Sequence, residues 1–303
     1  MNYEEIKTNK LTNLAHTIVL LLAMVGVLGF LGWMIAGLSG IIFAILFSAI
    51  SLLFTPKVPL DLIMKAYGAK RLNPSSIPRL HSITLALSKN ADLKKIPAIY
   101  YSPSRILNAF AAGSKDNSAI LVTDGLLNTL NATEMAGIIG HEITHIKNND
   151  MQVMWIANLF NRLTGSISFV GQMLILMSLP FLLISDVNIP FLPLVLLIFS
   201  PTLSFLLNLA LSRTREFEAD LGSAVLTGNP NFLVSALNKL EHYKRKSWPD
   251  FFITRPMNPQ IDFLSTHPAT NERIKRLLIL SPDYKDKLIR SNYTFRIPTV
   301  FSI

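Results

Sequence analysis

A short segment near the middle of the chain has residue types and a spacing that suit metal-dependent hydrolysis. Residues 141–145 are His-Glu-Ile-Thr-His, which matches the H-E-x-x-H pattern of two zinc-binding histidines and a glutamate base. With six histidines and eight glutamates among 303 residues, roughly 0.003 such matches are expected by chance. The segment therefore predicts a metal site rather than an accidental run of polar residues.

The sequence around this segment predicts the helix that the chemistry requires. Asn131 is a suitable N-cap with Glu134 at the N3 position, and an apolar stripe follows, so residues 131–150 are expected to be helical. Residues four apart lie on one helical face, so His141 and His145 can direct two imidazoles at one metal ion. An amphipathic helix with two solvent-facing histidines is the alternative interpretation.

The position of Glu142 and the absence of cysteine limit the kinds of catalysis that this segment can support. Glu142 is adjacent to the first histidine, where its carboxylate can reach a water on the metal rather than the metal itself. The chain has no cysteine, so it has neither disulfides, nor cysteine ligands, nor a cysteine nucleophile. Two histidines and a carboxylate with one open position are the usual catalytic zinc arrangement, and we expect one Zn²⁺ per chain.

A third protein ligand is expected from a charged segment further along the chain. The extended motif with a third histidine needs Gly at position 148 and His at position 151, but the chain has Asn148 and Met151. Downstream, Glu216 and Asp220 are four residues apart and share a helical face, whereas Glu218 points away from it. Glu216 is the predicted ligand, and Asp220 is predicted to accept the free N–H of a liganding histidine. Taken alone, this segment could also be a solvated charged turn.

Three uncharged stretches are long enough to lie in a membrane. They are Thr17–Phe54 with 38 residues, Leu163–Ser185 with 23 and Val187–Ser212 with 26. About 20 apolar residues cross a bilayer, so the first stretch predicts two spans with a turn at residues 37–40. The other two stretches predict a second pair, divided at Asp186. The first stretch is too long for a cleaved signal peptide, whose apolar region has about 7–15 residues.

The basic residues indicate the orientation in the membrane. All 28 Lys and Arg lie outside the predicted spans and outside the turns between paired spans. The positive-inside rule then places both termini and every sizeable hydrophilic segment in the cytoplasm of a multi-pass cell-membrane protein. An anionic inner leaflet explains the net charge of +9. Without aromatic and basic interleaving or a Gly-rich phosphate loop, we expect no nucleic-acid partner.

The hydrophilic segments divide the chain into alternating cytosolic and membrane parts. Strands are predicted at Ile96–Tyr101, Ile106–Ala112 and Ser118–Thr123, and a helix is predicted from Asn229-Pro230 to about Lys246. The predicted parts are a cytosolic N-terminus (1–16), the first hairpin (17–54), the first catalytic half (55–161), the second hairpin (163–212) and the second catalytic half (213–303).

These features resemble the HtpX family of membrane zinc metalloproteases, which belong with the C-a-a-X prenyl proteases in one peptidase clan. The resemblance rests on the H-E-x-x-H segment, on Glu216-x-x-x-Asp220, and on two apolar spans before and two between these motifs. Further matching residues are Asn108-Ala109-Phe110-Ala111, Asn148, Asp150, Ser212-Arg213-x-Arg215-Glu216-Phe217 and Ser265-Thr266-His267-Pro268. The stretch after about Leu280 is the part least covered.

The resemblance implies an integral-membrane endopeptidase of bacterial or archaeal type that acts in membrane-protein quality control under stress. Its partners would be membrane-protein or unfolded polypeptide substrates and the lipid bilayer, and the oligomeric state stays open. The predicted fold is a mainly α membrane protein. It has four transmembrane helices in two hairpins and a cytosolic α+β, zincin-like domain with a small β-sheet.

Further roles are predicted for residues on either side of the metal site. The oxyanion formed in peptide hydrolysis needs a stabiliser, for which His267 is the first candidate and Arg273 the second. Arg273 is also grouped with Asp220 as a residue that supports the ligands, and His267 could instead be a surface histidine. An exposed edge strand at Ile106–Ala112 would pair with an extended substrate. The substrate-binding residues predicted there are Asn108, Ala109, Phe110 and Ala111.

Three other interpretations of the protein's function can be tested against features of the sequence. A transporter or channel usually carries ionisable residues at membrane depth, and the predicted spans hold no Asp, Glu, Lys or Arg. A metal site inside the membrane disagrees with the polar end of the motif helix at residues 147–150. A metal-binding scaffold without turnover disagrees only with the presence of Glu142.

Overall fold

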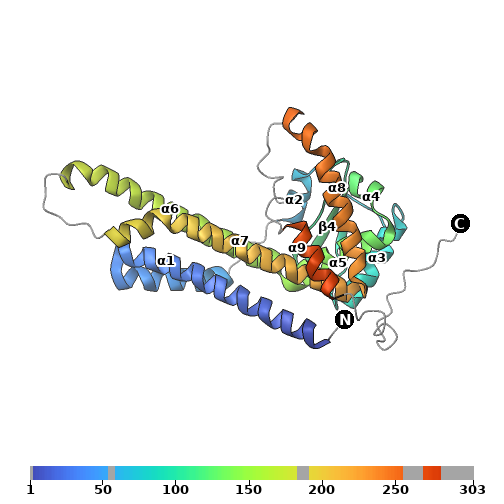
Figure 1. The fold of residues 1–303 in the computed structure, drawn as a ribbon, viewed down its shortest axis with the longest axis horizontal. Coiled ribbons are helices and arrows are strands. Elements are labelled where there is room, and N and C mark those ends of the chain that lie inside the picture. The colour runs from blue at the N-terminus through green and yellow to red at the C-terminus, as the bar shows by residue number, and fades with distance from the viewer. Residues whose placement is uncertain (1–2, 54–58, 183–190, 255–268, 281–303) are drawn as a thin grey trace. The chain divides into compact units, whose positions relative to one another are not determined.

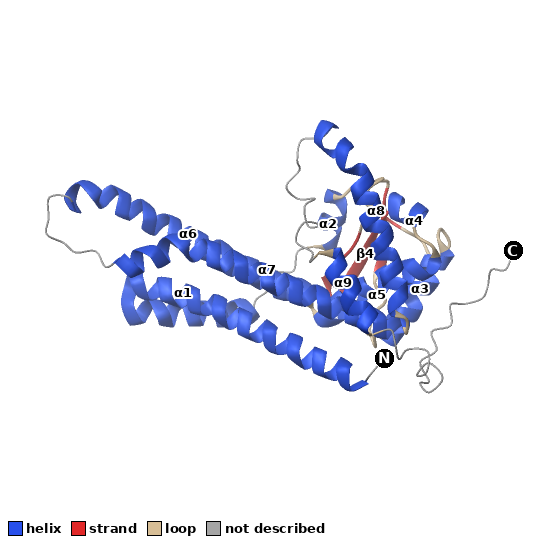
Figure 2. Cartoon of the chain, in the orientation of Figure 1, coloured by secondary structure: helices blue, strands red, loops and turns tan. Residues whose placement is uncertain are grey.

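The computed structural model describes residues 3–53, 59–182, 191–254 and 269–280 (Figure 1). The chain divides into two compact units. One unit comprises Met1–Asn13, Lys57–Met151 and Arg215–Ile303, and the other comprises Leu14–Pro56 and Gln152–Thr214. Helices account for most of the described residues, and the strands belong to the first unit (Figure 2).

Long apolar helices build the second unit. They are the larger parts of α1 (Tyr3–Leu53), α6 (Asp150–Leu182) and α7 (Phe191–Thr227), and one end of each helix belongs to the first unit. Among the described residues, the stretches Ile6–Ser51, Asp150–Pro180 and Leu192–Thr227 are long and apolar enough to cross a membrane. The apolar stretches predicted from the sequence are therefore helical where they are described. The predicted turn at Asp186 lies outside the described residues.

Helical geometry breaks inside α1 at the start of the predicted turn. Ala36 (φ −134°) and Gly37 (φ +58°) leave the helical region, and only glycine adopts the second conformation without strain. A Cβ atom added to Gly40 would lie 1.9 Å from the carbonyl oxygen of Gly32. In a continuous helix these residues would be about 12 Å apart along the axis. The chain therefore changes direction between them, and glycines at both positions allow the close approach.

A four-stranded mixed sheet is the frame of the first unit. Its strands are β1 (Lys70–Arg71), β2 (Ala98–Ser102), β3 (Ala109–Ser114) and β4 (Asn117–Thr123), in the order β1-β2-β4-β3. β2 runs parallel to β4, and β3 runs antiparallel to β4. Within the described residues β3 pairs with no other strand, so it is an edge strand as predicted. The short strand β1 was not predicted.

β3 begins later than the predicted Ile106–Ala112 because a side chain replaces the first ladder bonds. The Thr123 hydroxyl donates to the carbonyl of Ile106 at 2.6 Å and accepts from the backbone N–H of Asn108 at 3.0 Å. These bonds hold the segment next to β4 without regular strand pairing. Asn108 consequently lies just before the strand, and Ala109, Phe110 and Ala111 lie in it.

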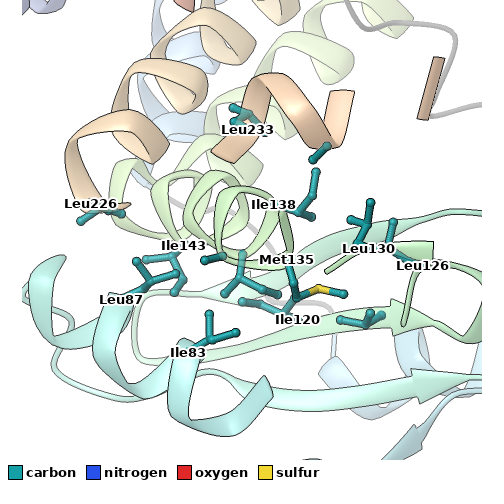
Figure 3. Close-up of a cluster of buried hydrophobic side chains, with 14 of the residues drawn as sticks. Ile83, Leu87, Ile120, Leu126, Leu130, Met135, Ile138, Ile143, Leu226 and Leu233 are labelled. Atoms are coloured by element: carbon teal, nitrogen blue, oxygen red, sulfur yellow. The ribbon is translucent and has the colours of Figure 1, made fainter. Parts of the chain in front are cut away.

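The core of the first unit lies between the sheet and its helices. Side chains of α3 (Pro78–Asn90), β4, α4 (Asp124–Thr129), α5 (Ala132–Asn148), α7 and α8 (Pro230–Thr254) meet there (Figure 3). α2 (Leu60–Ala66) packs on a second cluster with Tyr100 and Leu121. The sheet is therefore buried on both sides, and α5 is a central helix with residues such as Ile139 and Ile143 completely buried.

The predicted helix at Asn229-Pro230 corresponds to α8. The Asn229 side chain accepts the backbone N–H of Asn231 at 2.9 Å, as expected for an N-cap. α8 continues to Thr254, beyond the predicted end near Lys246. Its start packs against α5, because a Cβ atom on Gly137 would lie 2.7 Å from the backbone nitrogen of Leu233.

Candidate metal centre

α5 carries the H-E-x-x-H segment and begins as predicted. The Asn131 side chain accepts the N–H of Glu134 at 3.0 Å, and the Glu134 carboxylate accepts the N–H of Asn131 at 2.8 Å. This capping box fixes the first turn. The helix ends at Asn148, slightly before the predicted position 150, because Asn149 adopts the left-handed conformation with φ 59°.

Small residues bring the third predicted ligand next to α5. A Cβ atom on Gly222 of α7 would lie 2.2 Å from the Thr144 side chain of α5. The next residue of α7, Ser223, donates its hydroxyl to the carbonyl of Gly137, about two turns before Thr144 on α5, at 2.6 Å. The two helix backbones can approach this closely only because a side chain is missing at the contact. The residues Glu216 and Asp220 of α7 therefore face the histidines.

The predicted ligands converge. The Nε2 atoms of His141 and His145 are 3.1 Å apart. Oxygens of Glu216 lie 3.5 Å from Nε2 of His141 and 3.6 Å from Nε2 of His145. One ligand atom from each of the three residues lies within 4.8 Å of the others. Glu218 is buried as well, but its carboxylate accepts a hydrogen bond from Asn13 at 2.8 Å.

An aspartate carboxylate contacts the Nδ1 atom of each histidine, the ring nitrogen that does not face the other histidine. Nδ1 of His141 lies 3.0 Å from Asp220, and Nδ1 of His145 lies 2.7 Å from Asp150. Burial works against protonation, but the carboxylates of Asp150 and Glu216 outweigh it and raise the pKa of His145 well above its usual value. The pKa of His141 is also raised, because hydrogen bonds to Asp220 and Glu216 outweigh burial.

These residues fit a metal ion. Carboxylates accept hydrogen bonds, so each Nδ1 carries a proton. The same carboxylates favour a positive charge on the histidines, and a metal ion can supply that charge in place of a second proton, which leaves the lone pair of each Nε2 free to bind it. Two such nitrogens 3.1 Å apart beside a carboxylate repel one another unless a positive charge lies among them. Two nitrogens bound tetrahedrally to zinc at about 2.05 Å are about 3.3 Å apart.

Arg273 joins this cluster from α9 (Thr270–Ile279). Its guanidinium donates to both carboxylate oxygens of Asp220, at 2.8 and 2.6 Å, and lies 3.4 Å from Glu216. Burial opposes the charge, but Asp220 and Glu216 raise its pKa further above the ordinary value. Arg273 therefore stays charged, and its contacts are with Asp220 and Glu216, two of the residues that it was predicted to support. His267, the first candidate for the oxyanion, lies outside the described residues.

Asp150 is a supporting residue for which sequence reasoning predicted no role. The left-handed turn at Asn149 ends α5 and brings the Asp150 carboxylate back onto His145. Arg215 of α7 approaches the same carboxylate, with Nε at 3.4 Å. An aspartate five residues after the second histidine is the signal that could have found it. Each histidine is thus paired with an aspartate, and each aspartate with an arginine.

Asp150→Asn and Asp220→Asn are each expected to lower zinc affinity by about 10- to 100-fold, because the amide orients a histidine less well than a carboxylate does. Competition with a chromophoric chelator measures the affinity. Glu218→Gln is the matched control, because Glu218 is equally buried on the same helix but bonds to Asn13. A larger loss for Glu218→Gln than for Asp220→Asn would mean that the ligand face of α7 is misassigned.

Glu142 lies beside the edge strand. One of its carboxylate oxygens accepts the backbone N–H of Ala111 at 2.7 Å. This bond connects the predicted base on α5 to the predicted substrate strand. Phe110 lies on the other face of the sheet, where its ring is 4.7 Å from that of Tyr67. The backbone of β3, rather than the Phe110 side chain, therefore borders the metal centre.

The chain is similar in sequence to known proteases of one family. The sequence profile of peptidase family M48 matches residues 74–280. A protease HtpX homolog from Nostoc sp. (strain PCC 7120) is 34% identical over 284 residues, covering 88% of this chain and 96% of that protein. The homolog from Nostoc punctiforme is 35% identical over 290 residues (91% and 99% of the two chains). The homolog from Campylobacter curvus is 33% identical over 292 residues (89% and 96%).

Proposed function

The chain belongs to peptidase family M48 and is an HtpX-type protease, and we propose that it is a zinc endopeptidase of the cell membrane. Its proposed substrates are misfolded or damaged membrane proteins, cleaved at the cytosolic face. The observation that supports this best is the convergence of His141, His145 and Glu216 beside Glu142 and an open strand edge. One cluster thus combines a metal site, a base and a place for an extended peptide.

Each of these side chains has a separate proposed role in peptide hydrolysis. His141, His145 and Glu216 would hold one zinc ion, and zinc bound there supplies Lewis acidity and lowers the pKa of water. Glu142 accepts the proton of the attacking water and passes it to the leaving amine. Asp220 and Asp150 keep the two histidines in the tautomer that ligation needs.

The oxyanion has a separate proposed partner. The guanidinium of Arg273 is bound to Asp220 and close to Glu216, so it supports the ligands rather than the reacting carbonyl. His267 is the proposed donor to the oxyanion, in addition to the metal. This division gives each of the two candidate residues one role.

The free edge of β3 supports a main-chain mode of substrate binding. An extended peptide that adds to a strand edge is held through backbone hydrogen bonds, so its side chains can vary. Ala109 and Ala111 lie on this edge, and Asn108 directly precedes it. Broad side-chain tolerance suits a protease that removes damaged proteins of many sequences.

Cleavage of unfolded casein by the purified, zinc-loaded protein in detergent tests this proposal. Mass spectrometry of the products is expected to show internal fragments. Intact casein after long incubation would contradict a peptidase function. Release of single terminal residues would contradict the endopeptidase assignment.

The membrane arrangement is part of the proposal. The break at Ala36 and Gly37 divides α1 into two arms, which with α6 and α7 make four spans in two hairpins. Reporter tags at Asn2, Asp116 and Ser302 are expected to be cytoplasmic, and tags at Ser39 and Asp186 are expected on the far side. A cytoplasmic tag at Asp186 would show that the second pair of helices re-enters without crossing.

A further inference from the structure

The pairing of β3 with β4 defines which backbone groups face the free edge. The N–H of Thr123 donates to the carbonyl of Asn108, the residue opposite it, at 3.1 Å. In an antiparallel pair, residues that exchange hydrogen bonds alternate with residues that do not. Every second residue from Asn108 therefore faces β4. Ala109, Ala111 and Gly113 direct their N–H and C=O groups to the opposite side, where none of the described strands pairs.

One of these outward donors is already used. The N–H of Ala111 donates to Oε2 of Glu142 at 2.7 Å, in the range of a charge-assisted hydrogen bond. Gly113 still pairs with Ser118, but its φ of +98° departs from the extended conformation of a regular strand. Regular pairing along this edge therefore depends on Ala109 and Ala111. A substrate strand needs the same N–H that Glu142 occupies.

We propose that Glu142 and the substrate main chain compete for the Ala111 N–H, so that strand pairing releases the base. The inference rests on the proposed peptidase function and adds a control step to it. A single N–H makes one well-aligned hydrogen bond, because the bond weakens steeply away from linearity. When a substrate carbonyl takes that bond, Oε2 of Glu142 is free to turn toward the reacting centre.

This competition would couple the base to the conformation of the substrate. Only an extended segment can supply a carbonyl at the position of the Ala111 N–H while it also pairs with Ala109. Backbone groups of a folded protein are already hydrogen-bonded to one another. Folded segments would leave Glu142 held by the strand, and unfolded segments would release it. Selectivity for damaged proteins then follows from the backbone, without a side-chain pocket.

Two variants that lack the Glu142 carboxylate distinguish competition for the Ala111 N–H from other effects on substrate binding. Glu142→Gln keeps an oxygen that can accept the Ala111 N–H, whereas Glu142→Ala does not. Each is prepared as the full chain in detergent with zinc bound, with and without Ala111→Pro. Proline has no N–H, and at this position its ring faces the free edge rather than β4. Fluorescence anisotropy with fluorescein-labelled unfolded casein measures binding without cleavage.

We expect Glu142→Ala to bind casein about 2- to 10-fold more tightly than Glu142→Gln, the effect of one backbone hydrogen bond. Adding Ala111→Pro should remove this difference. Ala109→Pro is the matched control, because it deletes a neighbouring outward N–H and should weaken both variants equally. Zinc content and thermal melting of each variant establish that it is folded.

Equal affinities of Glu142→Ala and Glu142→Gln would overturn the competition, and so would a difference that persists with Ala111→Pro. In either case a wild-type protein that cleaves casein leaves the proposed function standing. A wild-type protein that neither binds nor cleaves casein would overturn the proposed function, and the competition with it.

Discussion

Glu142→Ala is expected to lower the rate of peptide cleavage by about 10²- to 10⁴-fold, the usual contribution of a positioned acid–base group. The carboxylate lies next to the ligands, but the three clustered metal-binding side chains do not include it. The same variant should therefore retain zinc in the wild-type amount. Cleavage of casein and metal analysis of the same preparation measure both effects.

The retained zinc is the internal control for this variant. A loss of both zinc and activity would show that Glu142 is a ligand or that the site has collapsed. Activity close to wild type would exclude Glu142 as the base. Neither result would be compatible with the mechanism.

The second large effect is expected from the ligands themselves. His141→Ala, His145→Ala and Glu216→Gln should each lose bound zinc and cleavage together, because two remaining protein ligands do not hold the ion. Glu216→Gln is the most informative of these variants, because it changes one carboxylate to an amide of the same shape. Inductively coupled plasma mass spectrometry after dialysis against buffer measures the metal content.

His242→Ala is the matched control for the histidine variants. His242 is an exposed residue of α8 and does not belong to the metal cluster. It should keep both zinc and activity. Stoichiometric zinc in His141→Ala or His145→Ala would mean that other residues bind the metal.

The local part of the site could be predicted from the sequence. The capping residues Asn131 and Glu134, and the spacing of the two histidines, are properties of a single helix, and α5 has the expected start and face. The edge strand was predicted for a similar reason, because β3 and β4 are joined by a short turn. Helical spacing also placed Glu216 and Asp220 on one face of α7.

The features of the fold and the site that could not be predicted depend on contacts between distant segments or on the backbone conformation of a single residue. The role of Asp150 requires the left-handed turn at Asn149, which the preceding helical pattern does not indicate. The start of β3 depends on the Thr123 hydroxyl, which competes with the backbone for hydrogen bonds. β1 pairs for two residues only, too few for a periodic signal.

The contacts of Arg273 with the residues around the metal site also could not be predicted from the sequence. From the sequence alone, Arg273 could either support the ligands or contact the oxyanion. The two hydrogen bonds to Asp220, which is 53 positions away in the sequence, support the proposed role beside the ligands. Such a pairing is a property of the folded chain rather than of either segment.

Stepwise zinc replacement tests the central claim most directly. The purified protein is stripped with a chelator, and zinc is added back while casein cleavage is measured. Cleavage should fall to background on stripping, rise in proportion to added zinc and level off at about one equivalent per chain, as expected for a single catalytic site. Cleavage that survives complete removal of the metal, or that zinc fails to restore in a still-folded protein, would contradict the assignment of His141, His145 and Glu216 as a catalytic metal centre.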